Sequence, residues 1–315
     1  MAFGSPRDAA GGFVVRIGSG DSRHPGSAGF TLVEMIVTLA IFATVMTVVF
    51  ATLIFQQRSF AVQSDRTEMR NNLRHGIDVL EKELKNAGSG LPFRPWVRLP
   101  AGWAGGSPVF LVSGLGVTDG ESDGPDSLVV AHTLSPPVRL TRGMETASSA
   151  LTVGAGIPWS PGMLGMISDG TEAEIFRVTR IDGGTLLQHG SGGIFRGELS
   201  KPYVRGASVA RILLAGYAVS VPGDHGLPAL VRREIDRDGN LHVRTVADGI
   251  FDLQVRGMMT DGSEQDVERF ESDPITQSLA VAVRIRLVSR GQLAGESRPW
   301  RMEAVVGLRN RGSAL

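Results

Sequence analysis

The run from Met35 to Phe55 constrains this chain more than any other segment, because it contains 21 residues and no charge. As a helix rising about 1.5 Å per residue it would be roughly 31 Å long, which matches the hydrocarbon thickness of a bilayer. Its only polar residues are threonines, whose hydroxyls can bond to the helix's own carbonyls. A buried helix of a soluble core is the alternative, but this length favours a membrane span.

The segment in front of this run is polar and rich in Gly and Ser, and its small residues Ser27, Ala28 and Gly29 precede the apolar stretch. A secretory signal peptide has the opposite order, with a shorter apolar stretch followed by a small-residue cleavage site. One acid, Glu34, stands at the entrance of the apolar run. A carboxylate in that position is costly, which predicts a functional partner for it.

The junction from Gly29 to Glu34 reads GFTLVE and passes directly into the apolar run. This string resembles the class III signal of type IV prepilins and of the pseudopilins of type II secretion. The resemblance implies that a membrane prepilin peptidase cuts between Gly29 and Phe30, and that the new Phe30 amine is N-methylated. It also implies that Glu34 pairs with the amine of a neighbouring subunit, since a carboxylate buried in a helical filament core needs a cation.

From Gln56 to Ala87 the sequence becomes charged but stays helix-like. Apolar residues recur largely at spacings of three and four, which predicts an amphipathic continuation of the helix. These residues are Phe60, Met69, Leu73, Ile77, Leu80 and Leu84. Gly88, Gly90 and Pro92 form a stop signal. We expect one helix from about Thr31 to Ala87, whose second half packs on a sheet.

After Pro92 the chain shows short segments separated by Gly, Ser, Asp and Pro, and no long helical period. Valine, isoleucine and leucine alternate with arginine in the later segments, which is typical of a strand with one buried face. The glycine-rich segment Asp182–Arg205 is predicted to be a surface loop. The predicted strands are Ser107–Val112, Asp126–Thr133, Glu172–Ile181, Ala207–Val221, Leu227–Ile235, Leu241–Val246, Phe251–Met258, Leu279–Val288 and Trp300–Leu308.

The expected fold class is α+β and pilin-like, with a long N-terminal helix packed on an antiparallel β-sheet body. Four parts follow along the chain: a leader peptide at 1–29, a transmembrane and filament-core helix at 30–55, its amphipathic continuation at 56–90 and a β-rich globular pilin domain at 91–315. The stretch from His75 to Gly88 and parts of the C-terminal region also resemble PilW-type minor pilins and J-type minor pseudopilins.

Charge and composition exclude several classes of function. Lys+Arg and Asp+Glu are both 32, so the chain lacks the basic excess of a nucleic-acid binder. It has no cysteine, which excludes disulfides, thiolate metal sites and cysteine nucleophiles. The sequence contains no phosphate loop, HExxH motif or dinucleotide fingerprint. We therefore expect neither an enzyme nor a bound cofactor.

Two weaker motifs overlap near residue 120. The segment Gly120–Gly124 matches the G-x-S-x-G pattern of a nucleophile elbow, but that motif needs a buried strand before it and a helix after it. Asp119, Glu121 and Asp123 have the alternate spacing of the first half of a calcium loop. The closing bidentate glutamate of such a loop is missing. A solvated turn is the favoured interpretation, and a calcium site is the weak alternative.

The resemblance implies a structural subunit, a minor type IV pilin that helps to start pilus assembly or sits near the pilus tip. A J-type minor pseudopilin of type II secretion is the first alternative, and a membrane-anchored periplasmic binding or adhesion protein is the second. The expected partners are the prepilin peptidase, other minor and major pilins and the assembly platform of the inner membrane, with no nucleic acid. The precursor would cross the bacterial inner membrane once, with its body outside the cytoplasm, before the subunit enters a pilus or pseudopilus.

Overall fold

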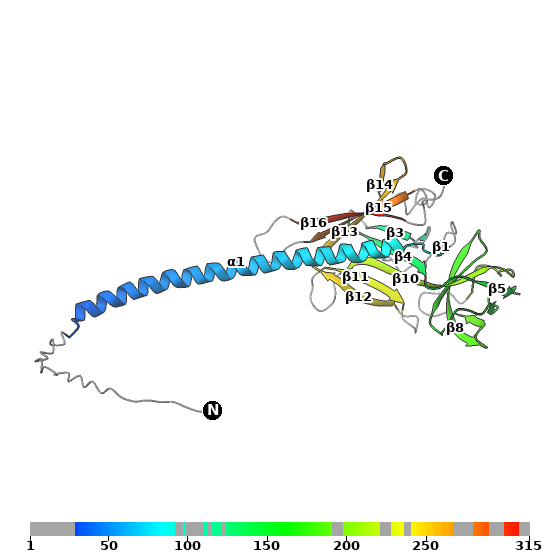
Figure 1. The fold of residues 1–315 in the computed structure, drawn as a ribbon, viewed down its shortest axis with the longest axis horizontal. Helices are drawn as coiled ribbons and strands as arrows, with labels where there is room; N and C mark the ends of the chain where they lie inside the picture. Colours follow the sequence, from blue (N-terminus) through cyan, green and yellow to red (C-terminus); the bar gives the residue numbers. More distant parts are fainter. Residues whose placement is uncertain are drawn as a thin grey trace, which may run out of the picture. The chain divides into compact units, whose positions relative to one another are not determined.

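A computed structural model gives the structure of the chain (Figure 1). The chain divides into two compact units, residues 1–58 and 59–315. The structure describes residues 29–91, 97–98, 110–111, 115–120, 124–190, 198–220, 228–235, 241–266, 280–289 and 299–308.

A single helix, α1 (Leu32–Asn86), confirms the long helix expected from the sequence. In the first unit its side chains are exposed, except for the half-buried Met46. In the second unit its buried residues are Met69, Leu73, Gly76, Ile77, Leu80 and Leu84. Phe60 was expected in this stripe but is 69% exposed, because burial of the helix begins only at Met69.

The other regular elements of the described chain are strands, and all of their pairings are antiparallel. They are β1 (Val97–Arg98), β2 (Phe110–Leu111), β3 (Leu115–Gly120), β4 (Gly124–Thr133), β5 (Val138–Arg142), β6 (Leu151–Val153), β7 (Leu164–Ser168), β8 (Ala173–Asp182), β9 (Leu186–His189), β10 (Ser208–Ser220), β11 (Ala229–Ile235), β12 (Leu241–Asp248), β13 (Ile250–Met259), β14 (Glu264–Asp266), β15 (Ala280–Ser289) and β16 (Trp300–Gly307). With α1 they form the expected α+β, pilin-like architecture.

The strands predicted from Asp126 onward are all present, and β2 lies within the predicted strand Ser107–Val112. The prediction of a surface loop over Asp182–Arg205 is wrong at β9. This four-residue strand lies between glycines, and it is fixed by pairing with β6 on one side and β8 on the other. The short strands β1, β3, β5, β6, β7 and β14 were not expected either.

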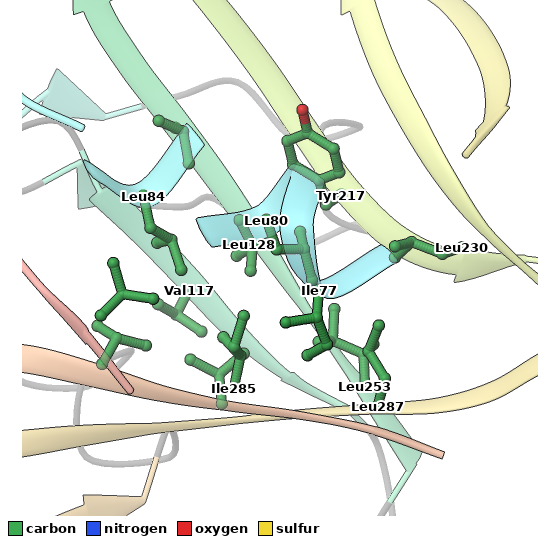
Figure 2. Close-up of a cluster of buried hydrophobic side chains, with 14 of the residues drawn as sticks. Ile77, Leu80, Leu84, Val117, Leu128, Tyr217, Leu230, Leu253, Ile285 and Leu287 are labelled. Carbon is green, nitrogen blue, oxygen red and sulfur yellow. The ribbon is translucent and has the colours of Figure 1, made fainter. Parts of the chain in front are cut away.

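The second half of α1 packs on two sheets at once (Figure 2). Ile77, Leu80 and Leu84 of the helix share one core with side chains of the larger sheet and of the four-stranded sheet β14-β13-β15-β16. Gly76 allows the close approach, because an added Cβ there would lie 2.8 Å from Leu287 of β15 and 3.4 Å from Leu230 of β11. The helix therefore forms the centre of this core.

The outer face of the four-stranded sheet is charged. The guanidinium of Arg284 on β15 lies 2.8 Å from Glu264 on β14 and 3.4 Å from Glu303 on β16. The residues before and after Arg284 in the chain, Val283 and Ile285, point to the opposite face of the strand and are buried in the core formed around α1. This strand thus confirms the one-sided burial predicted from its alternation.

A second, separate core lies inside a closed ring of six strands, which includes the green strands labelled β5 and β8 in Figure 1. Each strand pairs with two others in the order β5-β6-β9-β8-β7-β10 and back to β5. Strand β10 belongs both to this ring and to the sheet that packs on α1. Its first part, Ser208–Arg211, pairs with β5 and β7, whereas Ile212–Ser220 pairs with β4 and β11. We call this ring the inserted barrel, because residues 134–207 lie between the paired strands β4 and β10.

Leu80→Ala tests the central role of the helix stripe. Leu80 is fully buried, so its truncation should cost about 2–5 kcal/mol of stability through lost burial and a residual cavity. The melting temperature of the detergent-solubilised chain, followed by tryptophan fluorescence, should fall by several degrees. Leu134→Ala is the matched control, because Leu134 is 45% exposed and should change stability little. Equal losses for the two variants would contradict the packing described above.

Candidate functional site

The candidate site lies at the start of α1, where Gly29 and Phe30 precede the helix. Thr31 is the N-cap: its Oγ1 accepts a hydrogen bond from the Glu34 amide at 3.3 Å, and its carbonyl accepts one from the Met35 amide at 3.2 Å. Glu34 therefore occupies the third helical position of a capping-box sequence, where its negative charge also complements the helix dipole. Thr31 was not among the predicted site residues, although the Thr-x-x-Glu spacing is the signal for this cap.

The fold of the chain does not depend on contacts of Gly29 or Phe30. Phe30 is 76% exposed, and a Cβ added to Gly29 would meet nothing within 4 Å. Gly29 also does not adopt the positive φ that would require glycine. Since no contact of the described chain requires a glycine here, a requirement for it must come from another molecule.

The apolar half of α1 satisfies its own polar groups but not its apolar surface. The threonine hydroxyls donate to carbonyls three or four residues earlier at 2.8–2.9 Å, as expected for Thr38, Thr44, Thr47 and Thr52. Large apolar side chains remain exposed along this half, among them Ile41 at 59% and Phe50 at 60%. Among the described residues, α1 is the helix long and apolar enough to cross a membrane. This surface needs lipid or other helices to cover it.

The motif near residue 120 lies at a β-hairpin. Gly120 ends β3 and pairs with Gly124, which begins the antiparallel strand β4. A strand therefore follows the G-x-S-x-G sequence, where a nucleophile elbow requires a helix. Of the weak calcium-loop candidates, Asp119 lies on β3, whereas Glu121 and Asp123 fall outside the described residues. The described residues contain no cluster of three potential metal ligands.

A carboxyl that the sequence analysis did not single out lies beside this hairpin. Asp126 is only 1% exposed, and its Oδ2 accepts a hydrogen bond from the Val255 amide of β13 at 2.7 Å. Its Oδ1 accepts one from the Gly120 amide at 3.3 Å. Burial raises the pKa of Asp126 to about 7, with a smaller contribution from the nearby Asp119, and outweighs the lowering effect of the two amides. Asp126 therefore joins the two sheets through a group that titrates near neutrality.

Comparison with protein families gives one match. The family described as the prokaryotic N-terminal methylation motif matches residues 25–50, which include Gly29, Phe30 and Glu34. This match supports a type IV pilin-like or pseudopilin-like structural subunit. The motif implies processing by a prepilin peptidase and assembly with other pilins, and with the apolar helix it is consistent with a precursor anchored in the inner membrane. No curated protein and no solved structure matches the chain.

The raised pKa of Asp126 predicts a pH dependence of stability. Between the ordinary value of 3.8 and about 7 the folded state holds a proton that the unfolded state has lost. The free energy of unfolding should therefore fall as pH rises through this window and level off above pH 7. Asp126→Asn keeps an acceptor for the Val255 amide but cannot ionise.

The wild-type melting temperature should fall more between pH 5 and pH 8 than that of Asp126→Asn. Asp248→Asn is the control, because Asp248 is exposed at the end of β12. It should retain the wild-type profile. Identical profiles for wild type and Asp126→Asn would refute the assignment.

Proposed function

We propose that this chain is a minor type IV pilin of the PilW-like group, a non-enzymatic subunit that helps to start pilus assembly or sits near the pilus tip. One observation carries the proposal. A prepilin-type motif passes directly into a helix half whose apolar side chains are exposed in the folded chain. Such a helix is suited first to lipid and then to a bundle of similar helices, and the motif provides the means of releasing it from its leader.

The size of the body favours a minor over a major subunit. Beyond the helix core, the body carries the inserted barrel with a core of its own. A thin fibre built from many copies leaves little room for such bulk at every position. A subunit present in a few copies, at the start or tip of the fibre, has no such restriction.

We propose that the negative charge of Glu34 positions the subunit in the filament. Within a bundle of apolar helices its carboxylate would be desolvated, and the cleaved Phe30 amine of a neighbour is the matching cation. Removing one partner of such a buried pair costs on the order of 3–5 kcal/mol. The pairing would draw the incoming subunit into register.

Gly29→Val tests the processing step. Valine fits the folded chain, since the space beside Gly29 is open, but its branched side chain should block the peptidase. N-terminal mass spectrometry of membrane fractions should find N-methyl-Phe30 in wild type and an intact leader in the variant. Gly18→Val, another leader glycine, should be processed normally. An uncut leader in wild-type cells with an active prepilin peptidase would overturn the proposal.

Glu34→Gln tests the assembly step and separates charge from helix capping. Glutamine can occupy the same place in a capping box, but it is neutral. The variant should be cut and methylated, accumulate in the inner membrane and be depleted from sheared pili. Thr38→Val is the control in the same helix and should assemble normally.

Sheared pili that contain Glu34→Gln at the wild-type ratio to the major pilin would show that the charge is not needed. Wild-type protein found in pseudopili and not in pili would assign the chain to the type II secretion alternative.

A further inference from the structure

The inserted barrel is not needed to cover the helix. Strands β4 and β10 are hydrogen-bonded neighbours, with Thr133 opposite Ile212, so a short turn would suffice to join them. None of the buried residues in the helix core comes from residues 134–207. The presence of the inserted barrel is therefore not explained by packing against the helix, which suggests a function of its own.

The outer face of the barrel wall is hollowed, on the side opposite to the core residues Ile167 and Val209. The cavity has a volume of about 440 Å³, within the usual range for small-molecule sites. It lies where β5 begins, β7 ends and the chain enters β10. Its polar lining includes Arg139, Ser168, Asp169, Gly170, Arg205 and Ser208.

The two arginines of this cavity have no acidic partner among the described residues. Nη1 of Arg139 donates to the carbonyl of Gly206 at 3.0 Å, which positions the guanidinium without neutralising it. Arg205 makes neither a hydrogen bond nor an ion pair within the described part of the chain. Both side chains therefore keep charge-assisted donors for a ligand.

The one carboxylate in the lining is already engaged. Oδ1 of Asp169 accepts bonds from the Thr171 amide at 2.9 Å, the Thr171 hydroxyl at 2.7 Å and the Glu172 amide at 2.9 Å. Oδ2 lies 2.8 Å from the ammonium of Lys201, which is not part of the lining. These contacts hold the pKa of Asp169 well below its usual range. The charge left over in the cavity is therefore positive.

Ser168 supplies a further donor. Ser168 is only 2% exposed, and its Oγ accepts a hydrogen bond from the Gly170 amide at 3.0 Å. That bond occupies a lone pair of the hydroxyl and leaves its proton without an acceptor among the described residues. A buried hydroxyl of this kind at the edge of a positive cavity suits an incoming oxygen anion.

We infer that this cavity on the outer face of the inserted barrel binds a small oxygen anion, a carboxylate or a phosphate, between Arg139 and Arg205, with Ser168 as a neutral donor. The barrel then adds a ligand-binding module to the proposed filament subunit. The site does not depend on the N-terminal chemistry, so it stands or falls separately from the proposed function.

The test is titration of the full chain in a maltoside detergent, with inorganic phosphate followed by ³¹P line broadening and citrate followed by calorimetry. Ionic strength is held constant with chloride. The wild-type chain should bind at least one of the two anions, and comparison of the two titrations distinguishes phosphate from carboxylate. Arg205→Gln should weaken binding about tenfold, as expected for one charge-assisted contact. This variant breaks no bond of the described structure.

Ser168→Ala and Arg139→Gln extend the test to the other donors and should each weaken binding. Arg301→Gln is the matched control, because it removes the same charge from an exposed position on β16. It should bind like wild type. The inference is overturned if wild type binds neither anion at millimolar concentration, or if Arg205→Gln and Arg301→Gln bind equally well.

Discussion

The stripe of buried side chains on the second half of α1 is the contact on which both sheets of the body depend. Leu80 and Leu84 are fully buried. Their neighbours in the core come from strands spread along the chain, from Leu115 of β3 to Val306 of β16. Burial of this kind contributes roughly 1.5–3 kcal/mol for each large apolar side chain. Without the helix, each sheet would expose its apolar face to water. Gly76 makes the arrangement possible, because it admits Leu287 and Leu230 to the helix surface.

Polar groups fix the register that apolar packing leaves loose. The guanidinium of Arg232 on β11 lies 3.5 Å from Glu83 of the helix, and both side chains are largely buried. Asp126 does the same between the two sheets by accepting the Val255 amide. Buried polar and charged groups of this kind add little net stability, but leaving one without a partner is costly, which disfavours other registers. These polar contacts between neighbouring elements therefore restrict how the helix and the two sheets can be aligned.

The same helix has the opposite character in its first half. There the exposed apolar side chains find no cover in the folded chain, and the capping interaction of Thr31 with Glu34 already satisfies the first turn. This contrast explains how one element can serve two purposes. Its second half is buried against the two sheets of the body. Its first half is available to lipid and, under the proposed function, to neighbouring subunits. The inserted barrel adds a third property, a positively charged cavity remote in sequence from both.

The sequence by itself determined the features that depend on local periodicity. The uncharged run, the GFTLVE junction and the spacing of Leu73, Ile77 and Leu80 predicted the helix and its buried stripe, and alternation in β15 predicted which of its faces is buried. Tertiary structure alone decided the closure of the barrel and the change of partners along β10. Strands such as β6 and β9 are too short to show a period, and they exist only because neighbours distant in sequence supply their hydrogen bonds. The burial of Asp126 and the placement of Arg139 and Arg205 in the lining of one cavity have the same cause, since local sequence patterns do not show which distant segments will lie side by side.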